Sequence, residues 1–277
     1  MYSYGNLKNI SDKELTNCFN QAFADYPLPF HLTEKELKAC LRASCVDKEL
    51  SYGAFFNSKL IGFILNSYNI YNDKKVIFDI ATGIVPEHRG KKIFTQLFSF
   101  EEKELLKYDI EVYYLETLQQ NHIAISAYKN QGFSITREFE VLRLSAPTFE
   151  NNNLKVEYMR LEDFDFSIAK YCNYIQPSYE HSNNILKINS TLYEVAYRKQ
   201  DNKITAFCIF SKTNGNILQI WYEDINELKI VIQSLISNFS NIVVKNIDTK
   251  YSQVLELFYS LGFVEVVKQF EMFKTVI

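Results

Sequence analysis

Three basic side chains and a glycine cluster where an apolar run gives way to a helix-like run. Residues 84–94 read Ile-Val-Pro-Glu-His-Arg-Gly-Lys-Lys-Ile-Phe, so Arg89, Lys91 and Lys92 surround Gly90. The first N–H groups of a helix have no intrahelical acceptor, and the helix dipole adds about half a positive charge there. The pattern therefore predicts an anion cradle that would hold a phosphate group.

The flanking residues supply the strand and the helix that such a cradle needs. Residues 77–85 are apolar and β-like, and residues 93–106 carry apolar side chains at helical spacing with charged residues between them. The loop lacks the glycine spacing and the Lys-Ser or Lys-Thr pair of a nucleoside-triphosphate loop, and it carries no dinucleotide fingerprint. The alternative is a surface turn that happens to be basic.

The segment resembles motif A of the GNAT superfamily of N-acetyltransferases, which runs Gln or Arg, any two residues, Gly, any residue, then Gly or Ala. Glu87, Gly90 and Lys92 hold those positions, so Gly90 matches and the other two depart. The resemblance implies that the backbone of Ile84 and Val85 pairs with the pantetheine arm of acetyl-CoA. It also implies that the pyrophosphate is cradled by Arg89, Gly90, Lys91, Lys92, Ile93 and Phe94. The side chain of Lys92 would lean away from the phosphate or bind it directly. The alternative for Ile93 and Phe94 is that they pack beneath the loop and do not touch the cofactor.

A second signature follows about thirty residues later, where residues 121–133 read N-x-x-A-x-x-x-Y-x-x-x-G-F. Residues 123–130 predict a short helix, and Gly132 is placed to end it in the left-handed conformation. The segment resembles GNAT motif B. The resemblance implies that Asn121 binds the pantetheine arm and that Tyr128 protonates the thiolate leaving group.

The reaction that the resemblance implies is direct transfer of an acyl group from a thioester to an amine, without a covalent enzyme intermediate. A base must take a proton from the amine, often through water. Asp79, on the strand that ends at the cradle, and Glu116, on the strand before motif B, are the candidates. The alternative for each is a solvated strand residue or a cap to a neighbouring loop.

Two aromatic loops are candidates for the acceptor wall. The first, residues 25–30, lies between two predicted helices and carries Tyr26 and Phe30. Its position resembles the acceptor side of GNAT enzymes. The second loop carries Tyr179 and Glu180 and would line a pocket between two domains. An ordinary connection is the alternative for both loops.

The length of 277 residues predicts two domains, and an internal repeat supports that number. A shift of 130 residues aligns the strand at 111–116 with 241–246 and the Gly-Phe pair at 132–133 with 262–263. The alternative is that the apparent repeat is only a chance alignment of two generic β-α-β segments. Under this shift Asn121 becomes Tyr251, Glu116 becomes Asn246 and Tyr128 becomes Phe258.

The predicted fold class is α/β, with two tandem GNAT folds, each a mixed, mostly antiparallel central sheet flanked by helices. We expect a GNAT domain with the acetyl-CoA site at residues 1–145 and a linker at 146–153. Residues 154–277 would form a degenerate GNAT-like domain without the CoA-binding loop.

Composition limits the partners and the compartment. The 30 basic and 33 acidic residues give a net charge of -3, which argues against nucleic-acid binding. The sequence shows no apolar run of the ~18 residues that span a membrane and no signal peptide. An odd number of cysteines without a C-x-x-C pair fits reduced thiols, and the histidines show no metal spacing. We expect a cytoplasmic protein from an AT-rich bacterial genome, a monomer or homodimer that uses no metal.

The leading interpretation is an acetyl-CoA-dependent N-acetyltransferase that acts on a primary amine of a small molecule. One alternative is a non-catalytic acyl-CoA-binding sensor or scaffold, against which the retention of Asn121 and Tyr128 speaks. A second alternative is a two-domain aminoacyl transferase that uses aminoacyl-tRNA. The acidic charge balance disfavours it, and its donor would not need the cradle.

Overall fold

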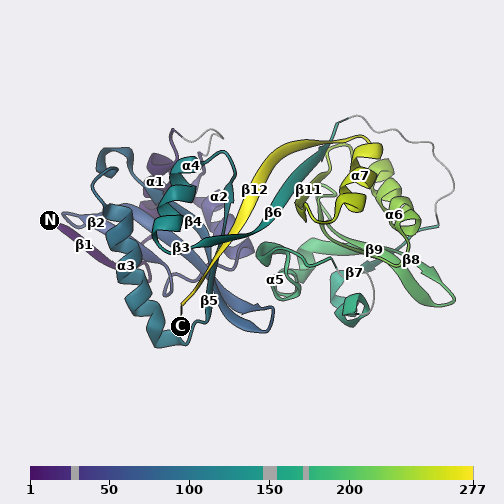
Figure 1. The fold of residues 1–277 in the computed structure, drawn as a ribbon, viewed down its shortest axis with the longest axis horizontal. Coiled ribbons are helices and arrows are strands. Elements are labelled where there is room, and N and C mark those ends of the chain that lie inside the picture. Colours follow the sequence, from purple (N-terminus) through teal and green to yellow (C-terminus); the bar gives the residue numbers. More distant parts are fainter. Residues whose placement is uncertain (26–30, 146–154, 171–174, 277) are drawn as a thin grey trace. The chain divides into compact units, whose positions relative to one another are not determined.

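The computed structural model describes residues 1–25, 31–145, 155–170 and 175–276. The chain divides into two compact units (Figure 1). Unit 1 comprises residues Met1–Thr117, Asn121–Thr136 and Glu271–Ile277, and unit 2 comprises the remainder, Leu118–Gln120 and Arg137–Phe270.

This division differs from the expected one at both ends of unit 2. Residues 137–145, expected in the first domain, belong to unit 2, whereas Glu271–Ile277 return to unit 1. The expected linker at 146–153 lies outside the described residues. Each unit is therefore built from segments that are distant in the sequence.

The sheet of unit 1 is mostly antiparallel, in the order β1-β2-β3-β4-β5 followed by the end of β12. Neighbours from β1 to β4 are antiparallel, and β4 and β5 are parallel. The strands are β1 (Tyr2–Asn6), β2 (Tyr52–Phe56), β3 (Lys59–Tyr71), β4 (Lys74–Ile84), β5 (Val112–Leu118) and β12 (Phe263–Thr275). The helices are α1 (Asp12–Ala22), α2 (Glu34–Ala43), α3 (Ile93–Leu105) and α4 (His122–Asn130), with short 3-10 turns at Pro86–His88 and Leu106–Tyr108.

Local signals in the sequence set the ends of these helices. Ser11 caps α1 by accepting the backbone N–H of Glu14 at 3.1 Å. Thr33 and Glu36 form a complete capping box at the start of α2. Gly132, with φ of 91°, follows α4 in the left-handed region that was predicted for it.

The strands β4 and β5 pair only over part of their length. Their register joins residues 76–79 to residues 112–115, although both strands continue beyond that point. A bulge lies there in β4, because Asp79 and Ala81 pair with consecutive residues of β3 and Ile80 is left over. The edge of β4 beyond Asp79 is consequently not covered by β5.

The strand β6 (Ser134–Leu144) starts in unit 1 and continues in unit 2, and β12 runs in the opposite sense, from unit 2 to unit 1 (Figure 1). Within unit 1, Phe273 packs against Tyr114 with ring centroids 6.0 Å apart. The backbone N–H of Val276 donates to the carbonyl of Glu111 at 3.0 Å. The last residues of the chain thus complete the sheet of unit 1.

Unit 2 repeats the mixed architecture, in the order β12-β6-β11-β10-β9-β8-β7. Among its pairs, β10 and β11 are parallel, whereas β7, β8, β9 and β10 are antiparallel neighbours. The remaining strands are β7 (Glu157–Arg160), β8 (Tyr193–Gln200), β9 (Lys203–Ser211), β10 (Ile217–Tyr222) and β11 (Val243–Asp248). The helices are α5 (Asn183–Ile188), α6 (Ile225–Asn238) and α7 (Ser252–Ser260), with 3-10 turns at Leu161–Asp163, Phe166–Lys170, Tyr179–His181 and Ser190–Leu192.

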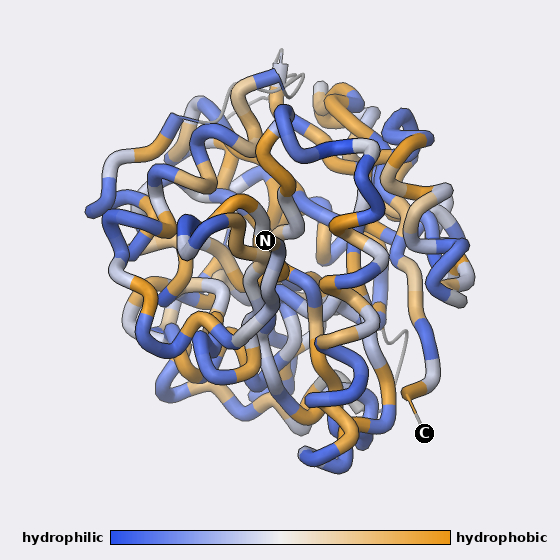
Figure 2. The backbone as a smooth tube through the Cα atoms, turned by 90° about the vertical axis from the view of Figure 1, so that its left-hand side faces the viewer, coloured by the Kyte–Doolittle hydropathy of each residue, from blue (hydrophilic) through white to orange (hydrophobic). Residues whose placement is uncertain are grey.

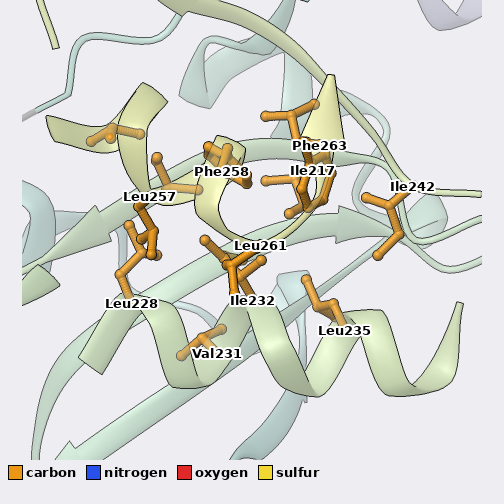
Figure 3. Close-up of a cluster of buried hydrophobic side chains, with 14 of the residues drawn as sticks. Ile217, Leu228, Val231, Ile232, Leu235, Ile242, Leu257, Phe258, Leu261 and Phe263 are labelled. Carbon is orange, nitrogen blue, oxygen red and sulfur yellow. The ribbon is translucent and has the colours of Figure 1, made fainter. Parts of the chain in front are cut away.

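An apolar core holds α6 in unit 2. Leu228, Ile232 and Leu235, at helical spacing, point from α6 into a cluster of buried apolar side chains (Figure 3). Phe258 of α7 is fully buried in the same cluster. The expected fold class, a mixed and mostly antiparallel sheet with flanking helices, is confirmed.

Hydrophobic and hydrophilic residues alternate along much of the backbone (Figure 2). Within the described ranges, no helix combines the length and the apolar character that crossing a membrane requires.

Candidate active site

The uncovered edge of β4 is the first element of the candidate site. The backbone N–H of Val85 donates to the carbonyl of Ile61, and the carbonyl of Val85 accepts the N–H of His88, both at 2.9 Å. Successive N–H groups of a strand point to opposite edges, so the N–H of Ile84 faces the edge that β5 leaves uncovered. Of the two residues expected to pair with pantetheine, only Ile84 thus presents a backbone donor there.

Arg89 is engaged within the fold rather than directed at the helix N-terminus. Its guanidinium forms a bidentate pair with Asp25 at 2.6 and 2.9 Å and donates to the carbonyl of Ala22 at 2.7 Å. Its Nε donates to the carbonyl of Ile84 at 2.9 Å. The hydrogen bonds from Arg89 hold the pKa of Asp25 below its ordinary value. Arg89 thus clamps the loop to the end of α1, and its expected contact with pyrophosphate stays a prediction.

The two lysines of the loop are exposed. The amine of Lys91 donates to the carbonyl of Glu87 at 2.8 Å. Lys92 precedes α3 with φ of 60°, and Gly90 has φ of 71°. A lysine in the left-handed region is strained, because its Cβ crowds the following carbonyl oxygen.

This geometry shifts the register of the first motif by two residues. If the pattern begins at Arg89, its two glycine or alanine positions fall on Lys92 and Phe94, and the left-handed conformation of Lys92 is the one that glycine adopts freely. In that register Arg89 matches, whereas Lys92 and Phe94 depart. The basic character of the loop hid this alignment in the sequence.

Ile93 and Phe94 pack into unit 1. Ile93 is 2% exposed, which agrees with the alternative that it packs beneath the loop. Phe94 is half-buried, and its ring meets the ring of Tyr128 edge-on at 5.6 Å. Phe94 therefore limits the space above Tyr128, where a glycine or alanine would leave it open.

Asn121 caps α4. Its side-chain carbonyl accepts the N–H of Ala124 at 3.1 Å. Its amide NH2 has no hydrogen-bond partner in the parts of the chain that the structure describes, so it can donate to a bound molecule. The expected contact of Asn121 with a pantetheine arm is compatible with this geometry and stays a prediction.

Asp79 and Tyr128, assigned separately from the sequence as base and acid, are bonded to each other. The hydroxyl of Tyr128 donates to Oδ2 of Asp79 at 2.9 Å, and the hydroxyl of Thr82 donates to the same oxygen at 2.6 Å. Burial raises the pKa of Asp79 to about 6, although both hydroxyl groups favour its ionised form. Burial, together with the charge of Asp79, raises the pKa of Tyr128 well above its ordinary value.

Glu116 does not join this pair. Tyr113 stacks on a phenylalanine of α3, whereas Tyr114 packs against Phe273, so successive side chains of β5 alternate between the faces of the sheet. Glu116 shares the face of Tyr114, and Tyr128 lies on the face of Tyr113. Of the two candidate bases, only Asp79 is brought to Tyr128.

A buried carboxyl group on α3 was missed by sequence reasoning. Glu101 is 0% exposed, and its Oε1 accepts hydrogen bonds from Asn66 at 2.5 Å and from the hydroxyl of Tyr113 at 2.9 Å. Burial raises the pKa of Glu101 well above its ordinary value, which favours the neutral carboxylic acid. Its spacing from Leu97 and Leu105, four residues on either side, was the signal that placed it on the apolar face.

The expected acceptor residues have separate outcomes. Tyr26 and Phe30 lie outside the described residues. Tyr179 is 0% exposed within unit 2, so the expectation that it lines an acceptor pocket is wrong. Glu180 is half-buried and stays a prediction.

The corresponding place in unit 2 is filled by its own chain. The strands β10 and β11 pair at Ile217 and Val244, and residues 175–177 lie against both strands, leaving a cavity of about 10 Å³. That volume is about the size of one water probe. The backbone N–H of Gln176 donates to the hydroxyl of Tyr251, and Asn246 donates to Ser178, both at 3.2 Å.

We call residues 175–178 the plug segment. It is also held by Arg137, which donates to the carbonyl of Gln176 at 3.1 Å. Tyr251 and Asn246, which bind the plug segment, are the residues that the repeat aligns with Asn121 and Glu116. The described residues of both units contain no cluster of His, Cys, Asp and Glu side chains suited to a metal ion.

Comparison with known proteins agrees with this architecture. The model of the acetyltransferase (GNAT) family matches residues 12–133. The curated proteins contain no match to the chain.

Solved structures of the same fold cover both units. A GCN5-related N-acetyltransferase from Sphaerobacter thermophilus is 10% identical, with a TM-score of 0.67 over 99% of this chain and 96% of that one. A tandem GNAT protein from the clavulanic acid biosynthesis pathway is 10% identical, with a TM-score of 0.67 over 100% of this chain and 99% of that one. A GCN5-related N-acetyltransferase from Anabaena variabilis is 16% identical, with a TM-score of 0.63 over 100% of this chain and 73% of that one. At these identities the likeness concerns the fold.

Proposed function

We propose, from the premise that this chain belongs to the acetyltransferase (GNAT) family, that it transfers an acetyl group from acetyl-CoA to a primary amine of a small molecule. The observation that carries the proposal is the hydroxyl of Tyr128, bonded to Asp79 beside the uncovered edge of β4. That position unites an acid, a proton acceptor and an open strand edge.

The groups around this edge fit an acyl-CoA donor. The N–H of Ile84 and the amide of Asn121 would bind the pantetheine arm, which carries amide groups of its own. The first N–H groups of α3 and the exposed amines of Lys91 and Lys92 would hold the phosphates. Phe94 narrows the approach, so its side chain must rotate or the arm must pass beside it.

Tyr128 supplies the acid for the chemical step. Attack by a neutral amine on the thioester carbonyl forms the C–N bond, and the C–S bond then breaks with the electron pair leaving on sulfur. Tyr128 is protonated at neutral pH because its pKa is raised by burial, so its hydroxyl proton is available for the sulfur.

A paired binding and turnover experiment tests the proposal. Acetyl-CoA is titrated calorimetrically into the wild type, into a Lys91→Ala, Lys92→Ala variant, and into a Lys103→Ala control, whose exposed lysine lies farther along α3. We expect wild-type binding near the micromolar range, about 8 kcal/mol, that is weakened only in the double variant. Thiol release with a panel of amines, polyamines and aminoglycosides then identifies the acceptor.

A second candidate function has an observation of its own. Lys92 and Phe94 occupy both small-residue positions of the revised motif, and Phe94 lies against Tyr128. A non-catalytic acyl-CoA-binding sensor or scaffold would bind acetyl-CoA in the titration and release no thiol with any amine. Absence of binding by the wild type would exclude both functions.

A further inference from the structure

We propose that Asp79 stores the proton that the acceptor nitrogen loses and returns it to the leaving sulfur, both times through the hydroxyl of Tyr128. The inference rests on the proposed N-acetyltransferase function and assigns a proton path to it. Asp79 would act only through Tyr128, and we therefore describe it as a positioning residue that also holds the proton.

The geometry of the pair supports this path. Asp79 is 6% exposed and Tyr128 is 8% exposed, so neither group exchanges protons readily with bulk water. Their oxygens are 2.9 Å apart, within the distance for direct proton transfer. Thr82 fixes the same carboxylate oxygen at 2.6 Å, whereas Oδ1 of Asp79 has no hydrogen-bond partner among the described residues.

The rings around Tyr128 hold its hydroxyl toward Asp79. Phe94 of α3 meets the tyrosine ring edge-on at 5.6 Å, and Phe133, which follows α4, meets it at 5.7 Å. A ring packed between two others has little freedom to turn its hydroxyl away. The aromatic contacts thereby keep the donor aimed at one acceptor.

The charged surroundings favour a proton store over a fixed charge. Among the described residues, the ionisable groups that face Asp79 are Tyr128 from α4, Glu101 from α3 and Tyr113 from β5, and none of these is a cation. Burial raises the pKa of Glu101 well above its ordinary value, which disfavours a second negative charge near Asp79. Burial raises the pKa of Asp79 to about 6, so the carboxylate is ionised at neutral pH and accepts a proton at small cost.

A lone tyrosine is a poor acid at this position. Loss of its proton to sulfur would leave a phenolate next to an ionised Asp79, and the repulsion of the two charges already raises the pKa of Tyr128. Simultaneous return of a proton from Asp79 avoids that pair of charges. Tyr128, the acid, is thus paired with Asp79, which has just taken up a proton and can return it.

The proton balance closes within the pair. After the neutral amine has formed the C–N bond, its nitrogen carries an extra proton, which passes to the oxygen of Tyr128 while the tyrosine proton passes to Oδ2 of Asp79. The C–S bond then breaks, and the electron pair leaves on sulfur. The sulfur takes the proton of Tyr128 while Asp79 returns its proton to the tyrosine oxygen, so both residues regain their initial states.

The first test is the pH dependence of an Asp79→Asn variant. Asparagine keeps the shape and an oxygen acceptor for Tyr128 but cannot store a proton. We expect wild-type kcat to fall at acidic pH with a limb near pH 6, where Asp79 becomes protonated before the amine reacts. The variant should lose that limb, and its kcat should fall on the order of 10² to 10⁴-fold at neutral pH with an unchanged Kd for acetyl-CoA.

A Thr82→Val variant supplies a readout that a purely structural role would not move. The Thr82 hydroxyl stabilises the ionised form of Asp79, and its removal should shift the acidic limb to higher pH. Val keeps the branched shape, and calorimetric titration with acetyl-CoA checks that the site still forms. The proton path would be overturned if the acidic limb of the kcat profile stayed at the same pH in Thr82→Val. It would also be overturned if that limb survived in Asp79→Asn.

An infrared titration separates this inference from the proposed function. The carboxyl band of Asp79, taken as the difference between wild type and Asp79→Asn, reports its protonation without turnover. Suppose that the carboxyl group of Asp79 titrates near pH 6, that the wild type is active, and that Asp79→Asn nevertheless keeps the acidic limb of its kcat profile. That combination would refute the proton path and leave the proposed function intact. Wild type that releases no thiol with any amine would refute the proposed function and the path with it.

Discussion

The two units place different material against the same pair of parallel strands. In unit 1 the edge of β4 beyond Asp79 is uncovered, and Tyr128 lies beside it. In unit 2 the plug segment lies against β10 and β11. The comparison teaches that the fold alone does not create a site: what matters is whether the chain covers the gap between these strands.

The two units also differ in the side chains at the positions that correspond to Tyr128 and Asp79. Phe258 aligns with Tyr128, and the position of Asp79 falls on Leu218 by strand register or on Ile217 by the bulge. Both alternatives are apolar. Unit 2 therefore contains neither the acid nor the proton acceptor, and it also fills the space where a substrate would lie.

The largest expected effect is the loss of the Tyr128 hydroxyl. Tyr128→Phe should lower kcat on the order of 10² to 10⁴-fold, because the sulfur loses its acid, while acetyl-CoA binding is retained. Phe258→Tyr, the reverse exchange in unit 2, should leave the rate unchanged. Thiol-release kinetics on both variants checks the pair, and a rate change in Phe258→Tyr would contradict the division of roles.

The next effect concerns stability. The folded pKa of Asp79, about 6, lies above the unfolded value, so this group favours folding at low pH and opposes it as pH rises through about 4 to 6. Asp79→Asn should therefore stabilise the protein at neutral pH by roughly 2 to 3 kcal/mol, and the gain should vanish below about pH 4. Urea unfolding at several pH values measures it. A gain that does not vary with pH would point to another cause.

A smaller effect is expected from the plug segment. Tyr251→Phe removes the acceptor of the Gln176 N–H and should destabilise the protein by about 1 kcal/mol. Acetyl-CoA should still bind once per chain, because the plug segment remains anchored by Arg137 and Asn246. Tyr197→Phe, which loses an exposed bond to Glu157, is the matched control. A second binding event in calorimetry would show that unit 2 keeps a usable site.

The smallest effect comes from the backbone of the cradle. Lys92→Gly should stabilise unit 1 by about 0.5 to 1 kcal/mol, because glycine adopts the left-handed conformation without strain. Lys91→Gly, at a position without positive φ, should be neutral or destabilising. Thermal unfolding of the two variants distinguishes them, and equal shifts would argue against strain at Lys92.

Local features of this fold were predictable because short-range chemistry determines them. The strand before the loop, the caps of α1 and α2 and the left-handed Gly132 follow from neighbouring residues. The pairing of Arg89 with Asp25 and of Asp79 with Tyr128 joins residues 64 and 49 positions apart. Such contacts depend on tertiary packing, so neighbouring residues in the sequence contain no signal that Arg89 pairs with an aspartate or that Asp79 bonds to Tyr128.

Sequence reasoning also missed where each unit ends. The repeat indicated two copies of one fold, but a repeat contains no signal for the exchange of a strand between the copies. Residues 137–145 and 271–277 carry ordinary strand patterns that fit either unit. Only the paired partners in the sheet decide to which unit each strand belongs.

The return of β12 to unit 1 has a consequence for how the protein is made. Phe273 and Val276 contact Tyr114 and Glu111, so unit 1 cannot complete its sheet until residues 271–276, which are synthesised after the whole of unit 2, have left the ribosome. The residues of the candidate active site are synthesised before residues 137–270 of unit 2, whereas the last strand segment of the sheet of unit 1 is synthesised after them. A chain interrupted before residue 271 would therefore carry every residue of the candidate site but would lack the strand segment that completes the sheet of unit 1.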